Sequence, residues 1–131
     1  MARIHYILAA LTAILLLATA CSSPRSVTLT NTNNGGNLEV KDGGQIIVKL
    51  DGNPSTGYTW EAKDLDATMF KQVGDPVFSS SNPGLVGSAG TLTLTFNALK
   101  AGTSQLTMIY HRPWETGVDP INTFTVRVTV K

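Results

Sequence analysis

Cysteine and histidine are nearly missing from this 131-residue chain, which has one cysteine and two histidines. A single cysteine excludes an intrachain disulfide. Cys21 and His5 lie near the N-terminus, so His111 is the one histidine of the remaining sequence. A Cys–His catalytic pair or a zinc site built from these residues is therefore excluded there. We expect no metal and no cofactor.

Charge is also scarce. Charged residues make up 15% of the chain, and ten basic against nine acidic side chains give a net charge of +1. A phosphate backbone needs a basic surface, so we expect no nucleic-acid partner. The hydrophobic share of 42% is enough for a core, and the length suits one domain.

The N-terminus indicates export. Arg3 precedes an apolar run over residues 7–17, and small residues lead to Cys21. This order is typical of a secretory signal peptide, here over residues 1–20. Cys21 directly after Ala20 resembles the processing site of bacterial lipoproteins, which implies that its thiol carries a lipid. The usual site has leucine three residues before the cysteine, where this chain has Ala18.

Residues 21–26 would then be the lipidated cysteine and a short tether, and residues 27–131 the folded domain. The protein would be an exported, membrane-anchored lipoprotein of the bacterial cell envelope, in the periplasm or at the cell surface. It would touch the membrane through its N-terminal lipid only. Two alternatives stay open at this point: an uncleaved membrane anchor, and an ordinary signal peptide followed by a free cysteine.

After residue 27, apolar residues recur at every second position. This period is typical of strands with one buried face. Clusters of Gly, Asn, Asp and Pro separate the runs and indicate turns. The chain is therefore predicted to be all-β, an immunoglobulin-like antiparallel β-sandwich of seven to eight strands. The expected strands are 27–30, 38–40, 46–50, 58–62, 69–73, 91–96, 104–111 and 124–130.

Three segments have sequences that suit a binding loop better than a β-strand. Each of them alone could also be an ordinary loop that joins two strands. In residues 53–58, Pro54 fixes φ and Gly57 permits a sharp bend, which predicts a stiff projecting turn. Residues 82–90 form a glycine-rich loop, which we expect to be mobile. Trp114 follows Pro113 outside the strand pattern, and exposed Trp beside Arg is typical of binding hot spots. Trp60 lies within a predicted strand and is expected in the core.

In this order the three segments resemble the chagasin family of cysteine protease inhibitors. That family has an Asn-Pro-Thr-Thr-Gly-Tyr or -Phe loop, a glycine-rich loop and an Arg-Pro-Trp loop. The resemblance implies a monomeric inhibitor, not an enzyme, whose three loops occlude the active-site cleft of a papain-like cysteine protease. The protease-binding residues that it implies are Asn53, Pro54, Ser55, Thr56, Gly57, Tyr58, Gly87, Ser88, Ala89, Gly90, Arg112, Pro113 and Trp114.

Two residues depart from the family pattern, and two other functions remain open. Ser55 replaces a threonine, and Ala89 replaces a glycine, which would strain the loop if that position needs a positive φ. A cell-envelope binding module for a carbohydrate or protein ligand would have the same fold. A Ser-His-Asp hydrolase could use His111 and Asp119, but the chain has no G-x-S-x-G turn to expose the serine.

The single cysteine generates the first testable prediction. A protein that begins at Ser22 should fold cooperatively as a soluble monomer, and reductant should not change its free energy of unfolding, because no thiol pair exists to be reduced. Urea unfolding with and without reductant tests this. Circular dichroism dominated by helix would contradict the sandwich.

Overall fold

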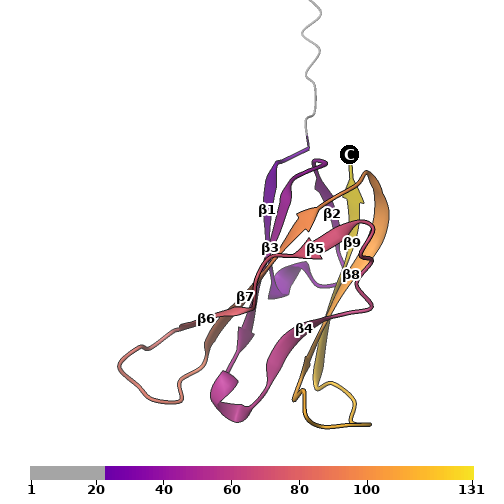
Figure 1. Cartoon of the computed structure of the whole chain (residues 1–131). Coiled ribbons are helices and arrows are strands. Elements are labelled where there is room, and N and C mark those ends of the chain that lie inside the picture. The colour runs from indigo at the N-terminus through magenta and orange to yellow at the C-terminus, as the bar shows by residue number, and fades with distance from the viewer. Residues whose placement is uncertain (1–22) are drawn as a thin grey trace, which may run out of the picture.

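The computed structural model describes residues 23–131, so the predicted signal peptide and Cys21 lie outside the described residues. The described chain forms two facing β-sheets (Figure 1). Two single-turn 3-10 helices, η1 (Asn31–Asn33) and η2 (Pro54–Thr56), interrupt the strands. Within residues 23–131 no helix is long and apolar enough to span a membrane.

In the five-stranded sheet, β3 (Gln45–Gly52) pairs antiparallel with β7 (Gly90–Ala98), and β1 (Ser26–Thr30) lies parallel to β3. Two short strands, β5 (Phe70–Gln72) and β6 (Val77–Ser80), pair with opposite ends of β7. The four-stranded sheet has the order β2–β9–β8–β4. Its strands are β2 (Asn37–Val40), β9 (Asn122–Val130), β8 (Gly102–His111) and β4 (Thr59–Lys63).

The core lies between the sheets, where side chains at alternate strand positions meet. Burial of such a side chain stabilises the fold by about 1.5–3 kcal/mol. Among residues 23–131 no polar or charged side chain is buried. The central strands β3, β7 and β9 contribute these buried residues, none more than 3% exposed: Ile46, Val48, Leu50, Leu92, Leu94, Phe96, Phe124, Val126, Val128 and Val130.

The predicted all-β sandwich is confirmed, and a strand appears at each of the eight expected places. The structure differs in two respects. It has a ninth strand, β6, which lies at a sheet edge and pairs only with β7, so it needs no alternating core pattern. The sheets are also mixed, because β1–β3 and β2–β9 are parallel. Alternation identifies the buried face of a strand but not the direction of its neighbour.

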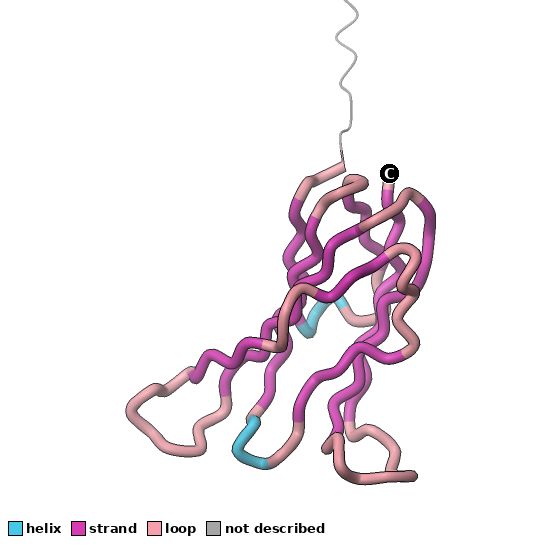
Figure 2. Tube along the Cα trace, viewed as in Figure 1, coloured by secondary structure: helices cyan, strands magenta, loops and turns pink. Residues whose placement is uncertain are grey.

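The two ends of the sandwich differ. The N–H groups of Lys41 and Asp42 donate to the carbonyls of Pro24 and Lys131 at 2.9 and 2.7 Å, so the first described residues and the C-terminus share one end. The β3–β4, β6–β7 and β8–β9 connections lie at the opposite end (Figures 1 and 2). We call these the terminal end and the loop end.

Candidate functional site

Three connections form the loop end. We call residues 53–58, between β3 and β4, the Asn-Pro loop. Residues 81–89, between β6 and β7, are the glycine loop, and residues 112–121, between β8 and β9, are the tryptophan loop. The structure thus gathers all of the residues predicted to bind a protease at one end of the sandwich.

The Asn-Pro loop is a closed turn stabilised by its own backbone. The Asn53 carbonyl accepts the N–H of Thr56 at 3.1 Å, and the Pro54 carbonyl accepts the N–H of Gly57 at 2.9 Å. Asn53 also caps η2, because its Oδ1 accepts the Ser55 N–H at 3.1 Å and the Ser55 hydroxyl at 2.5 Å. Gly57 ends the turn at φ 84°, a left-handed conformation that favours glycine. The predicted stiff turn therefore has a specific hydrogen-bond basis.

Asn53 also ties the Asn-Pro loop to the glycine loop. Its Nδ2 donates to the Gly87 carbonyl at 3.0 Å, and the Ser55 hydroxyl reaches the same carbonyl at 3.5 Å. Gly87 has a φ of 77°. Both polar atoms of the Asn53 side chain are thus engaged within the protein. We conclude that the Asn53 side chain shapes the surface by joining the two loops.

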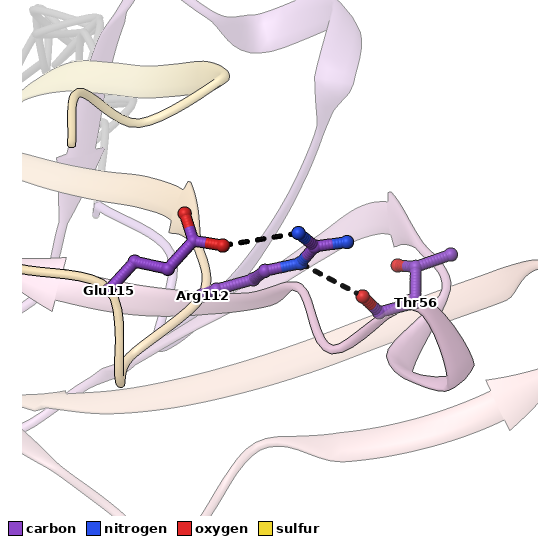
Figure 3. A network of polar contacts seen from close by, with 3 residues as sticks. All are labelled: Thr56, Arg112 and Glu115. Atoms are coloured by element: carbon purple, nitrogen blue, oxygen red, sulfur yellow. Dashed lines mark hydrogen bonds and ion pairs between the residues drawn. The ribbon is translucent and has the colours of Figure 1, made fainter.

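Arg112 ties the Asn-Pro loop to the tryptophan loop (Figure 3). Its Nε donates to the Thr56 carbonyl at 3.1 Å, and its Nη1 donates to Oε1 of Glu115 at 3.1 Å. The guanidinium carbon lies 4.5 Å from the centre of the Tyr58 ring, within range of a cation–π contact. Arg112 therefore links the two loops, and its contacts with Glu115 and Tyr58 fix the position of its guanidinium group.

Trp114 is 67% exposed, whereas Trp60 is 3% exposed and lies in the core. The Trp114 ring rests on Gly57. A Cβ added at Gly57 would overlap Cη2 of the ring and lie 2.9 Å from Cζ2. The six-membered ring of the indole is therefore held by the Asn-Pro loop, while most of the residue is exposed to solvent.

The glycine loop is held by serine hydroxyls, although its composition suggested mobility. The Ser88 hydroxyl pairs with the Ser80 hydroxyl at 2.5 Å and donates to the Asn82 carbonyl at 3.1 Å. The Ser81 hydroxyl donates to the Ala89 carbonyl at 2.6 Å. Ala89 does not have a positive φ, so it brings none of the strain considered above. Gly90, in contrast, is required, because a Cβ there would overlap the carbonyl oxygen of Ser79.

Sequence reasoning missed several exposed apolar residues of the loop end. Leu85 and Val86 are 61% and 101% exposed at the tip of the glycine loop, beside the glycines that were predicted. Val118 and Ile121 are exposed in the tryptophan loop. Two consecutive apolar residues after Pro83-Gly84, within a turn, were an available signal. Exposed apolar side chains gathered in one region are typical of a protein-binding surface.

The side chains of the loop end are suited to binding a partner. His111 directs Nε2 to Oε2 of Glu61 at 2.6 Å, so the histidine of the hydrolase alternative is engaged with a carboxylate of β4. Among residues 23–131 no group of His, Cys, Asp and Glu could hold a metal ion. What the geometry provides is an edge made of three linked loops, and the two flanking loops carry exposed apolar side chains.

Comparisons with known proteins agree with this geometry. A sequence profile of chagasin family peptidase inhibitors matches residues 39–128. Amoebiasin-2 of Entamoeba histolytica is 30% identical over 104 residues, covering 79% of this chain and 84% of that protein. Chagasin of Trypanosoma cruzi is 30% identical over 91 residues, covering 66% and 81%. The crystal structure of a cysteine protease inhibitor from Entamoeba histolytica superposes with a TM-score of 0.71 at 28% identity, covering 81% and 96%.

The contact between Trp114 and Gly57 generates a second prediction. Gly57→Ala should cost about 1 kcal/mol of unfolding free energy through left-handed strain and should also displace the Trp114 ring. Gly43→Ala is the matched control, because Gly43 has a φ of 76° with nothing within 4 Å of an added Cβ. Only Gly57→Ala should shift the NMR signal of the Trp114 indole N–H. An unshifted signal would show that the ring does not rest on Gly57.

Proposed function

This chain belongs to the chagasin family of peptidase inhibitors, and from that premise we propose that its three linked loops close the active-site cleft of a papain-like cysteine protease. It is a protein inhibitor of cysteine proteases and not an enzyme. The family profile spans residues 39–128, which include all three loops. This assignment favours the inhibitor over the carbohydrate- or protein-binding module.

One observation carries the proposed mode of inhibition: three segments far apart in sequence form one surface. Asn53 bonds to Gly87, and Arg112 bonds to Thr56, so neither flanking loop is independent of the central turn. The Asn-Pro loop would lie over the catalytic cysteine. The glycine and tryptophan loops would each take one flank of the cleft, with Leu85, Val86 and Trp114 as apolar contacts.

The closed turn explains why the loop would block the protease without being cut. Cleavage requires a substrate carbonyl aligned with the attacking thiolate and an oxyanion site for its oxygen. In the Asn-Pro loop the carbonyls of Asn53, Pro54 and Thr56 already accept hydrogen bonds from the inhibitor's own N–H groups. Alignment of one of these carbonyls for attack would require the turn to open. These three carbonyls are therefore held out of line for attack while the loop covers the nucleophile.

Preorganisation is the second physical advantage of this arrangement. Binding costs less when few side chains and loops must be ordered. The described loops already hold their shape through Asn53, Arg112 and the serine hydroxyls. An interface of ordinary size, about 1,600 Å² in total, would then be formed with a small entropy cost.

We also propose that the protein is exported as a monomer and anchored in the bacterial cell envelope by a lipid on Cys21, after removal of residues 1–20. The position of the loops supports this reading. Pro24 is held at the terminal end, three residues after Cys21, and the loops lie at the opposite end. An anchor at Cys21 would therefore leave the loop end directed away from the membrane and open to a protease.

The inhibitory role generates a third prediction. The domain should inhibit papain in an assay with a fluorogenic substrate, and Trp114→Ala should raise its inhibition constant about 30- to 1,000-fold, because truncation of a buried interface Trp costs about 2–4 kcal/mol of binding. Its free energy of unfolding should barely change, since Trp114 is 67% exposed.

Trp60→Ala is the matched control for this experiment. It should cost about 3–5 kcal/mol of unfolding free energy, because Trp60 is buried and its Nε1 donates to the Asp51 carbonyl at 2.9 Å. The proposed function is wrong if the wild-type domain leaves papain active. The role of the tryptophan loop is wrong if Trp114→Ala destabilises the fold as much as Trp60→Ala and inhibition persists.

The anchor generates a fourth prediction. The full chain expressed in a bacterium should incorporate labelled fatty acid, should partition with membranes and should resist a salt wash, because several acyl chains anchor stably. Cys21→Ser should abolish the labelling. Equal labelling of the variant would contradict lipidation at Cys21.

A further inference from the structure

We infer that Tyr110 is a positioning residue, whose hydroxyl holds the Asn-Pro and glycine loops in the shape that binds a protease. Tyr110 lies in β8 beneath the loops and is half-buried. The inference rests on the proposed function for its effect on inhibition. Its effect on the shape of the free loops is independent of any protease.

The Tyr110 ring has a fixed position. It stacks on Trp60 with ring centres 5.0 Å apart and 28° between the planes, and it lies against Tyr58 at 5.4 Å. Gly52 borders the ring on a third side, because a Cβ built there would lie in ordinary van der Waals contact, 3.4 Å from Cε2 and from the hydroxyl oxygen of Tyr110. Since Trp60 belongs to the core, the ring extends the rigidity of the core to the base of the loops.

The hydroxyl transmits this position to the Asn-Pro loop. The backbone N–H of Asn53 donates to the Tyr110 hydroxyl at 2.9 Å in a partly buried contact. Asn53 is the residue whose side chain caps η2 through Ser55 and reaches the Gly87 carbonyl. Movement of Asn53 would therefore disturb two loops at once. The Tyr110 hydroxyl thus helps to fix the position of Asn53, on which the shape of both loops depends.

The tryptophan loop depends on Tyr110 in a different way. Tyr110 comes two residues before Arg112, and its backbone carbonyl accepts the N–H of Ile121 at 3.0 Å, which closes the neck of that loop. A change of side chain leaves this backbone bond in place. Tyr110→Phe therefore tests the hydroxyl alone, because the variant keeps the ring, its stacking and the backbone hydrogen bond to Ile121.

The test compares Tyr110→Phe with Thr107→Val. Thr107 lies on the same strand, and its hydroxyl pairs with that of Thr125 at 3.3 Å in a partly buried contact outside the loops. In the free protein, Tyr110→Phe should speed hydrogen exchange at the amides of Asn53, Ser55, Thr56 and Gly57 about tenfold, the size expected for the loss of one hydrogen bond. Exchange at Ile121 should not change. Thr107→Val should leave all of these amides unchanged.

The same variants are then assayed against papain. The inhibition constant of Tyr110→Phe should rise in inverse proportion to the fraction of molecules that keep the competent loop shape. A fraction of one tenth raises it about tenfold. The inhibition constant of Thr107→Val should stay at the wild-type value. Unchanged exchange at Asn53 to Gly57 in Tyr110→Phe would overturn the inference, whatever papain shows. Faster exchange with an unchanged inhibition constant would also overturn it. Failure of the wild-type protein to inhibit papain would instead reject the proposed function, and the exchange data would still decide whether Tyr110 shapes the loops.

Discussion

The contact between two apolar sheet faces is the constraint on which the rest of this molecule depends. The described core holds apolar side chains and no polar or charged ones, so its cohesion comes from burial and close packing. No disulfide is possible within the chain. The sandwich must therefore supply by packing alone the rigidity that its loops require. Strands β3, β7 and β8 run directly from this core to the loop end, which gives the loops fixed points of attachment.

Side-chain hydrogen bonds join the three loops of the loop end. Asn53, Arg112 and three serines use their hydrogen-bonding groups within the protein. These polar groups determine the shape of the loops, whereas Leu85, Val86 and Trp114 present apolar surface to solvent. This division suits an inhibitor, because a surface that is already ordered loses little entropy on binding. The serine hydrogen bonds also explain how a glycine-rich loop can hold one shape. They restrict its backbone conformation, as larger side chains would otherwise do.

Local patterns in the sequence were enough to predict most of the fold. Alternation at residues 91–96 and 124–130 predicted strands, and the mid-strand position of Trp60 predicted its burial. The three loops were found because their motifs appear in the order of a known family. The strand β6 was not predicted, because Val77 and Phe78 are consecutive and both exposed. The contact of Trp114 with Gly57, and that of Tyr110 with Asn53, join residues 57 positions apart, and no local pattern encodes such a pairing.

The parallel pairing of β1 with β3 has a mechanical consequence. The chain enters the domain at the terminal end of β1, and a bound protease would hold the loop end, to which β3 leads directly. Tension between an anchor at the N-terminus and a captured protease would then act along the strands. Five register positions, from Ser26↔Gln45 to Thr30↔Lys49, would share this load in shear, whereas a load across the strands would break their hydrogen bonds one after another. The pairing of β1 with β3 would thus resist a force directed along the strands.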